Sequence, residues 1–299
     1  MTTATPFFFV DVFASEPLTG NPLALVPDAD GLSEATMRAI AREFNQSETT
    51  FLVRPTLPGA TWRLRSFTPI GVEVLGAGHN AMGAWIWLAD TGRLPAGEEE
   101  FSQQIGEEVL PVRVNRLVGA RSVVSMDQSA PVFGIGVRDV VELAAALGLE
   151  GADLAEGGVA QTVSTGVGHL LVPLRDRAAV DRAVPDAARL ASALREAGAE
   201  GCYVYSLDPV APEDGSVAYA RFFNPTVGIA EDPATGTAAG PLLASLVVAG
   251  TVADGASVVV EQGFSLGRPS RLRVDVFGQR VRLSGSGLVV ADGTLHLEE

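Results

Sequence analysis

Two acidic side chains stand directly before a run of small residues and then an apolar stretch, in the sequence AEDPATGTAAGPLLASLVVAG of residues 230–250. Small residues at the beginning of a helix leave its first backbone N–H groups open, and these groups, with the helix dipole, can bind an anion. A carboxylate beside such a turn can orient a substrate. Glu231 and Asp232 therefore indicate half of a catalytic site, held in place by the helix that follows.

A similar pattern occurs earlier in the chain. Each copy has a strand that ends in Arg-x-Phe-polar-Pro, a loop with an acidic residue, a turn of small residues and an apolar segment that ends in glycine. The first copy comprises residues 65–69, Glu73, residues 76–79, residues 80–90 and Gly92, and the second comprises residues 221–225, Glu231 with Asp232, residues 234–237, residues 240–250 and Gly250. With two extra residues in the second loop, Gly78 aligns with Gly236 and His79 with Thr237. The shared order predicts a duplication with two similar lobes related by a pseudo-twofold axis; the alternative is chance similarity in Gly- and Ala-rich sequence.

Strand patterns dominate the rest of the chain. Apolar, β-branched and aromatic runs predict strands at residues 7–13, 22–26, 49–53, 61–67, 109–117, 121–126, 169–174, 202–207, 217–223, 256–262, 271–277, 281–290 and 294–299. Helical spacing predicts helices over 33–44, with Ser33 as N-cap, over 138–148 and over 186–198, whereas 155–166 indicates a Gly-rich connection. Residues 80–90 and 240–250 are apolar on every side, which predicts that a curled sheet encloses each of them.

Composition limits the possible partners. The chain has 299 residues, enough for two lobes, and 36 acidic against 21 basic side chains give a net charge of −15. This charge argues against nucleic acid or an anionic membrane as a partner. One cysteine, Cys202, fits a reducing cytoplasm. We expect no signal peptide, because no basic region precedes the first apolar run, and no apolar run reaches the ~20 residues that span a bilayer.

Several segments together resemble the PhzF family, the phenazine-biosynthesis isomerases and their relatives. These segments are FVDVFASEPLTGNPLALV, AIAREFNQSETTFL, GAGH, STGVGHLLVPL, RFFNPTVGIAEDPATGTAAGPL and EQGFSLGRPSRLRV, which cover nearly the whole chain. The resemblance implies an α+β fold of the diaminopimelate epimerase type, with two pseudo-symmetric lobes that each form a β-barrel around a central buried helix. We expect the first lobe over residues 1–118, completed by strands at about 285–299, and the second over 119–284. The active site is expected between them, in a homodimer.

The same resemblance implies isomerisation by proton transfer at carbon, without a cofactor. Glu48, the glutamate of Asn-x-Ser-Glu-Thr, corresponds to the central acid/base of the family. His79 and Asp232 match its other catalytic positions, and Thr237 stands where many relatives have serine. The epimerases of this fold use a pair of cysteines, which Cys202 alone cannot provide.

Each candidate also has a structural interpretation. From the neighbouring sequence alone, Glu48 is interpreted as a charged loop residue or as a carboxylate that accepts backbone hydrogen bonds. His79 is interpreted as a helix-capping or core imidazole. Asp232 could complement a helix dipole from the first turn, and Thr237 could be an N-cap. Asn21 could pin the barrel or contact substrate. The predicted substrate-binding set is Gly78, Asn80, Gly236, Thr237 and Asn21.

Other polar groups carry less information. We expect His169 and His296 to be structural or surface residues. Three histidines without H-x-x-x-H spacing predict no metal site, and neither GVGH nor GAGH has the pattern of a dinucleotide site.

The chain also departs from its relatives. Many of them read Pro-Phe-Ala-Gly-His-Pro-Thr where this chain has Leu75-Gly76-Ala77-Gly78-His79-Asn80-Ala81, so the loss of the aromatic ring predicts more space and a different substrate. The leading hypothesis is an isomerase of secondary metabolism in which Glu48 moves a proton within a small carboxylic acid. An amino-acid racemase or epimerase, with Asp232 as second base, and a non-catalytic binding protein on the same fold are the alternatives.

Overall fold

The computed structural model describes residues 2–116 and 119–298. Contacts divide the chain into two units, one of residues up to Met126 together with the segment from Ser284, the other of Asp127–Leu283. The chain enters the second unit within β8 (Val123–Gln128) and leaves it within β17 (Arg280–Gly285). The predicted end of the first lobe, residue 118, lies outside the described residues.

The first unit is a mixed sheet with one central helix. Its further elements are β1 (Thr2–Val12), β2 (Asn21–Val26), a 3₁₀ turn (Ala29–Gly31), α1 (Glu34–Phe44), β3 (Thr49–Val53), β4 (Trp62–Phe67), β5 (Glu73–Val74), α2 (His79–Asp90), β6 (Glu100–Ile105), β7 (Glu108–Asn115) and β18 (Gly287–Glu298). The strands follow the order β18-β1-β2-β3-β4-β6-β7-β8, and β5 forms a short hairpin on β4. Strands from both ends of this order, β18 and β7, pack on α2, so the sheet curls around the helix.

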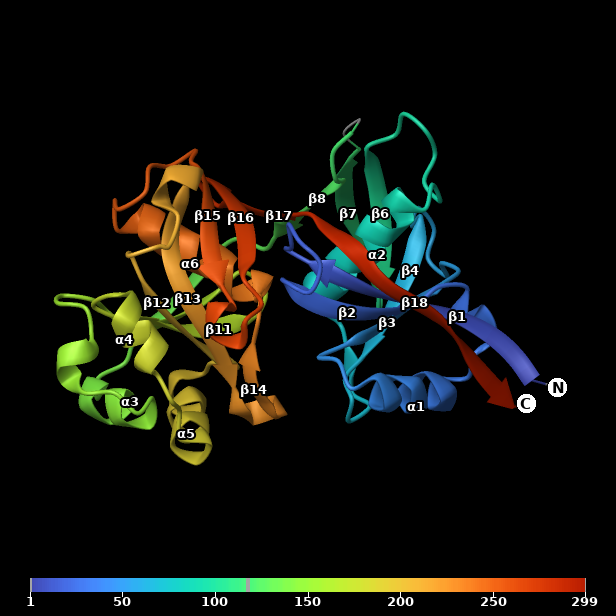
Figure 1. Ribbon diagram of the computed structural model, residues 1–299. Coiled ribbons are helices and arrows are strands. Elements are labelled where there is room, and N and C mark those ends of the chain that lie inside the picture. The colour runs from blue at the N-terminus through green and yellow to red at the C-terminus, as the bar shows by residue number, and fades with distance from the viewer. Residues whose placement is uncertain (1, 117–118, 299) are drawn as a thin grey trace. The chain divides into compact units, whose positions relative to one another are not determined.

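The second unit repeats this arrangement with additional outer helices. Its elements are β9 (Val132–Gly136), α3 (Val140–Ala146), β10 (Gln161–Ser164), β11 (Gly168–Pro173), α4 (Arg177–Arg182), α5 (Ala187–Ala197), β12 (Gly201–Ser206), β13 (Ser216–Asn224), β14 (Ile229–Asp232), α6 (Gly236–Val248), β15 (Ser257–Gln262) and β16 (Ser270–Phe277), with 3₁₀ turns at Gly151–Asp153, Pro212–Asp214, Pro225–Val227 and Phe264–Leu266. The strand order is β9-β10-β11-β12-β13-β15-β16, and β14 forms a hairpin on β13. Helix α6 packs against β10, β11 and β16, strands distributed along the whole order (Figure 1).

The duplication is visible in the strand directions. Along β1-β2-β3-β4-β6-β7 the successive pairs are antiparallel, parallel, antiparallel, parallel and antiparallel. The same sequence of pairings runs along β10-β11-β12-β13-β15-β16. In both units the central helix follows the short hairpin and precedes the next parallel strand. The α+β fold with two similar lobes, each built around a buried helix, is therefore confirmed.

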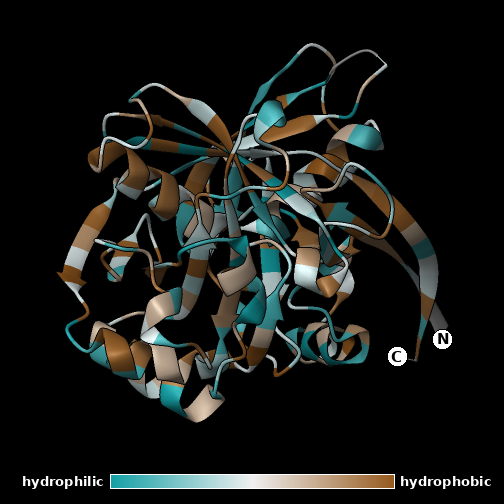
Figure 2. Cartoon of the chain, turned by 60° about the vertical axis from the view of Figure 1, so that its left-hand side comes forward, coloured by the Kyte–Doolittle hydropathy of each residue, from teal (hydrophilic) through white to brown (hydrophobic). Residues whose placement is uncertain are grey.

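Burial explains why the two central helices lack a polar stripe. Every residue of α2 from His79 to Ala89 is buried, as is most of α6 up to Leu246. Hydrophobic stretches run along many of the strands in Figure 2, and hydrophilic stretches are frequent in the connecting loops. Gly83 of α2 lets β1 and β2 approach the helix, because a Cβ there would lie 2.6 Å from Leu23 Cδ2 and 2.8 Å from Val12 Cγ2.

Some local predictions were wrong. Residues 155–166, expected as a connection, contain β10, and residues 281–290, expected as one strand, are divided between β17 and β18. Helix α4 had no clear sequence pattern because it has only 6 residues. Ser33 does cap α1, since its Oγ accepts a hydrogen bond from the N–H of Thr36 at 3.1 Å. The last residue of the strand expected at 109–117 lies outside the described residues.

Candidate active site

Glu48 lies in the corner between α1 and β3. Asn45 ends α1 in the left-handed conformation, with φ 50°, and thereby turns the chain away from the helix axis. The Glu48 side chain is 15% exposed. Burial removes the carboxylate from water and raises the pKa of Glu48 to about 7. The predicted loop residue is therefore a largely desolvated acid that changes its protonation state near neutral pH.

His79 stands next to this carboxyl group. It is the first residue of α2, and its Nε2 lies 3.1 Å from Oε2 of Glu48. The angles at this contact are not those of a hydrogen bond, and Oε2 accepts no other hydrogen bond from the described residues. The N-cap position belongs to Gly78, so the interpretation of His79 as a helix cap was wrong. The 3.1 Å separation nevertheless places the two titratable groups within reach of each other, as proton exchange requires.

Asn80 fixes the Gly-rich turn before α2. Its Oδ1 accepts a hydrogen bond from Gly78 N at 2.8 Å, and its Nδ2 donates to Gly76 O and to Ser66 Oγ, both at 3.1 Å. Ser66 is in turn 2.9 Å from Thr50 Oγ1. Where many relatives have proline, this chain thus holds the turn through an amide. These hydrogen bonds engage both ends of the Asn80 amide, and its contact with substrate stays a prediction.

Asn21 is the first residue of β2, in register with Val12 of β1. It is completely buried. Burial favours a structural role for Asn21 within the first unit. Its side chain has no exposed surface through which it would contact a substrate in this conformation.

In the second unit, Asp232 ends β14 and is 7% exposed. Its Oδ2 accepts a hydrogen bond from Thr235 Oγ1. Because it lies on the strand before the helix, Asp232 is not a first-turn acid of α6, and that alternative was wrong. Thr235, not Thr237, occupies the N-cap position, which also corrects the interpretation of Thr237 as a cap.

Gln262 cross-links this turn and was not anticipated. Its Nε2 donates to Asp232 O at 2.7 Å and to Thr235 Oγ1 at 3.0 Å. Its Oε1 accepts from Thr235 N at 3.1 Å and from Tyr203 OH at 3.0 Å. Gln262 and Tyr203 are both completely buried. The sequence offers one signal for Gln262, because it is an uncharged amide at the end of the apolar run SVVVEQ. A buried amide must find hydrogen-bond partners, so its position indicates a cross-linking role.

The beginning of α6 is held from two further sides. Gly236 O accepts a hydrogen bond from Gln128 Nε2 at 2.9 Å. A Cβ at position 236 would lie 2.2 Å from Leu283 Cδ2, so a larger residue would require the Leu283 side chain to move. Thr237 Oγ1 lies 3.0 Å from His169 Nε2. His169 is 3% exposed, and burial lowers its pKa to about 4, so its ring is neutral at physiological pH.

An arginine–glutamate pair precedes the turn in each unit. Arg65 binds Glu73 through Nε at 2.8 Å and Nη2 at 2.7 Å, and Arg221 binds Glu231 through the same atoms at 2.9 and 2.7 Å. Each guanidinium also lies over the phenylalanine ring two residues after it in the motif, at 5.0 Å from Phe67 and 4.9 Å from Phe223. The acidic loop is therefore tied back to its strand in both copies, which indicates a structural role for Glu231.

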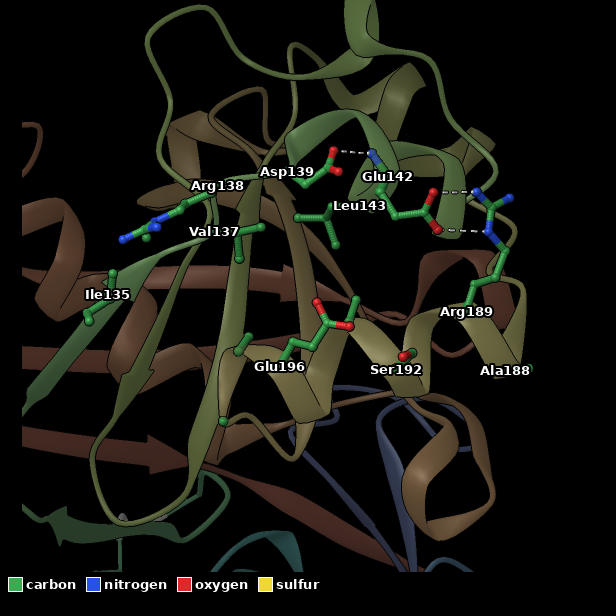
Figure 3. Close-up of a pocket in the computed structure, with 14 residues that line it drawn as sticks. Ile135, Val137, Arg138, Asp139, Glu142, Leu143, Ala188, Arg189, Ser192 and Glu196 are labelled. Carbon is green, nitrogen blue, oxygen red and sulfur yellow. Dashed lines mark hydrogen bonds and ion pairs between the residues drawn. The ribbon is translucent and has the colours of Figure 1, made fainter.

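An open groove of about 950 Å³ elsewhere in the second unit contains none of the candidate residues (Figure 3). It lies between β9, α3 and α5, and Arg189 of α5 binds Glu142 of α3 there at 3.0 and 2.8 Å. This ion pair lowers the pKa of Glu142. Asp139 accepts a hydrogen bond from Glu142 N and Glu142 is paired with Arg189, so two of the three acidic side chains that line the groove are already engaged.

Other chemistry finds little support in the part of the chain that the structure describes. No group of three or more His, Cys, Asp or Glu side chains within residues 2–116 and 119–298 could hold a metal ion. Cys202 is completely buried, and burial raises the pKa of its thiol. Over the same residues, no helix is both long and apolar enough to cross a membrane.

Comparisons with known proteins found relatives that match nearly the whole chain. The family model described as phenazine biosynthesis-like protein matches residues 10–293. A trans-2,3-dihydro-3-hydroxyanthranilate isomerase of Pseudomonas aeruginosa is 34% identical over 297 residues, which cover 97% of this chain and 99% of the relative. The crystal structure of a PhzF-family phenazine biosynthesis protein from Bacillus anthracis superposes with a TM-score of 0.89 at 28% identity, covering 99% of this chain and 100% of the other.

A more distant structure supports the fold type alone. A hydroxyproline epimerase from Agrobacterium vitis matches with a TM-score of 0.66 at 13% identity, over 99% of this chain and 92% of the epimerase. The epimerase-like architecture is thus shared well beyond the range in which sequences remain similar.

Proposed function

Because this chain belongs to the phenazine biosynthesis-like (PhzF) family and is an isomerase like its curated relatives, we propose that it moves a proton between two carbons of a small carboxylate-bearing substrate, with Glu48 as the acid/base and no cofactor. The observation that carries this proposal is the buried carboxyl group of Glu48, 3.1 Å from His79. A group with a pKa of about 7 is populated both as a base and as an acid at neutral pH.

The reaction needs only one such group. Ionised Glu48 takes a proton from an acidified C–H, the electron pair enters the conjugated system of the substrate, and the double bond shifts. Glu48 then returns the proton to a second carbon, so a C–H bond breaks, a C–H bond forms and no electron is gained or lost. His79 exchanges the proton with Glu48 or donates a hydrogen bond to the charge that develops on the substrate.

The second unit is proposed to contribute binding. The N-terminus of α6, with Gly236 and Thr237, has open N–H groups and the positive end of a helix dipole, which suit a carboxylate. Asp232 is held by Thr235 and Gln262 and is proposed to orient the substrate. Gly78 is proposed to contribute in the same way at the beginning of α2. This local binding would operate against the overall charge of −15.

The substrate is proposed to belong to the class of unsaturated amino or hydroxy carboxylic acids. The relative from Pseudomonas aeruginosa acts, by its name, on trans-2,3-dihydro-3-hydroxyanthranilate, which is the first compound to test. Leu75 is 66% exposed beside the turn at residues 76–79, and no aromatic ring stands there, so a bulkier acid of secondary metabolism is the second choice. We further propose that the protein is a cytoplasmic homodimer. Sedimentation of the purified protein tests whether it is a dimer.

Proton transfer in D₂O tests the proposal directly. The protein is incubated with trans-2,3-dihydro-3-hydroxyanthranilate, and with a panel of unsaturated acids, while ¹H NMR follows bond position and deuterium incorporation. We expect a shifted double bond with deuterium at the new C–H, and a loss of at least 10²-fold in rate for Glu48→Gln. Glu43→Gln, an exposed change on α1, is the matched control.

Three results would contradict the proposal. Turnover that survives in Glu48→Gln would remove Glu48 as the base. Deuterium at an α-carbon with inversion and no bond shift would instead identify a racemase. Wild-type protein that binds members of the panel and exchanges no proton would support the non-catalytic alternative.

A further inference from the structure

The buried imidazole below the beginning of α6 has no role in the reaction as described so far. His169 is the second residue of β11, and Figure 1 shows this strand alongside α6 in the second unit. Its Nε2 lies 3.0 Å from Thr237 Oγ1. Its ring meets Phe222 edge to face, with centroids 5.0 Å apart at 85°. The imidazole is thus fixed by packing on one side and by one hydroxyl group on the other.

The other ring nitrogen decides which tautomer is present. His169 Nδ1 is buried and has no hydrogen-bond partner among the described residues. A proton on Nδ1 would leave a buried N–H group unsatisfied, which is rarer and more costly than an unused acceptor. The neutral ring therefore carries its proton on Nε2.

This tautomer sets the direction of the hydrogen bond to Thr237. An Nε2–H group can only donate, so the threonine oxygen accepts. The hydroxyl proton of Thr237 is then left to donate elsewhere. Thr237 is partly exposed whereas His169 is not, so the hydroxyl group can reach a ligand that the imidazole cannot touch.

We propose that His169 is a positioning residue that makes the Thr237 hydroxyl a hydrogen-bond donor to the substrate carboxylate at the beginning of α6. The inference rests on the proposed function, because it names which group of the second unit recognises the anion. Thr237 lies in the first turn of α6, where backbone N–H groups are also open. Hydroxyl and N–H groups then form one donor set around a carboxylate oxygen.

Removing the imidazole is expected to weaken substrate binding more than chemistry. His169→Leu leaves Thr237 free to rotate, so we expect KM to rise about tenfold while kcat changes less than about twofold, because the lost contact exists before and during the reaction. His169→Gln keeps an amide N–H near the position of Nε2. Its KM should therefore rise by no more than half as much as that of His169→Leu, compared as log KM. Thr237→Val should raise KM as much as His169→Leu does.

A double-mutant cycle separates positioning from packing. If His169 acts only through the hydroxyl group, His169→Leu adds less than about twofold to KM in the Thr237→Val background. KM effects that multiply in the double variant, or a fall in kcat with KM unchanged, would overturn the inference. Thermal unfolding of each variant identifies any that do not fold, and for those Thr237→Ala and His169→Phe, which also remove the hydroxyl group and the imidazole, complete the cycle.

The tautomer can be read without any turnover. In ¹⁵N-labelled protein at pH 7, long-range ¹H–¹⁵N correlations of His169 should show the proton on Nε2 and an unprotonated Nδ1. A proton on Nδ1, or an imidazolium at pH 7, would refute the inference. Because this readout needs no substrate, it stays valid if Glu48→Gln leaves proton transfer intact, and the two proposals therefore fail separately.

Discussion

Replacing Glu48 by glutamine should abolish activity and at the same time stabilise the protein at alkaline pH. Burial raises the pKa of Glu48 from 4.5 to about 7. In the folded state the group therefore holds its proton between these two values, while the unfolded chain has released it. The free energy of unfolding of the wild type must fall as pH rises through this window, and the full penalty is present above pH 7.

The magnitude follows from the size of the shift. One pKa unit corresponds to 1.36 kcal/mol, so ionising Glu48 in the fold costs about 3 kcal/mol relative to the unfolded chain. Between pH 5 and pH 8 this ionisation should lower the free energy of unfolding of the wild type by about 2.5 kcal/mol. A positive charge on His79, whose Nε2 lies 3.1 Å from Glu48 Oε2, would offset part of this cost.

Denaturant unfolding of three proteins at pH 5 and pH 8 measures this difference. The wild type, Glu48→Gln and the exposed control Glu43→Gln share every other carboxylate, so the comparison cancels the remaining pH dependence. We expect Glu48→Gln to gain about 2.5 kcal/mol over the wild type between pH 5 and pH 8, and the control to gain almost nothing. Parallel pH dependences for all three, within about 0.5 kcal/mol, would refute the assignment of Glu48 as a desolvated acid.

Activity should respond to the same ionisation in the opposite direction. In the proposed reaction the ionised form of Glu48 is the base that takes the first proton, so kcat/KM should fall as pH decreases through about 7. A profile that stays flat between pH 6 and pH 8 would mean that another group takes the proton.

The remaining candidate groups give sharper or simpler tests. His79→Asn removes the group 3.1 Å from Glu48, so we expect kcat to fall about 10²-fold in the D₂O assay; an unchanged kcat would leave His79 without a role in proton transfer. Arg221→Lys loses the fork that binds Glu231 together with three Nη1 hydrogen bonds to backbone carbonyls, and should cost about 3 kcal/mol in denaturant unfolding. Arg65→Lys is its matched counterpart and should cost less, because Arg65 is more exposed and bonds carboxylates only. The Cys202 thiol is completely buried with a raised pKa, so iodoacetamide should label it only after unfolding; labelling of the native protein at the unfolded rate would contradict this burial.

Much of the architecture could be predicted because duplication left a local trace. Arg-x-Phe-polar-Pro, an acidic loop, small residues and an apolar segment lie within a few tens of residues in each copy. Residues 80–90 and 240–250 have no polar face, which indicated two enclosed helices before any strand order was known. Short elements escaped prediction for the same reason: α4 has 6 residues and β10 has 4, too few for a periodic pattern to stand out.

The site was harder to predict because its contacts join distant parts of the chain. Gln262 reaches Asp232 across 30 residues, and His169 reaches Thr237 across 68. No spacing rule connects such positions, so His169 was expected to be structural or at the surface, and Gln262 was not singled out. The burial that raises the pKa of Glu48 likewise involves residues distant in sequence from the NQSETTF motif, such as His79.

The two units share one plan, and the first residues of their central helices differ in a way that bears on the proposed function. The first unit begins α2 with His79, whose imidazole faces the Glu48 carboxyl group at 3.1 Å. The aligned residue in the second unit is Thr237, and an imidazole reaches it from β11 instead. A ring with a pKa of about 4 cannot take up a proton at neutral pH, so His169 can only fix a hydrogen bond. The proposed function therefore assigns proton transfer to Glu48 and His79 of the first unit and anion recognition to Thr237 of the second. On this proposal, variants of the two imidazoles should differ accordingly, with His79 affecting kcat and His169 affecting KM.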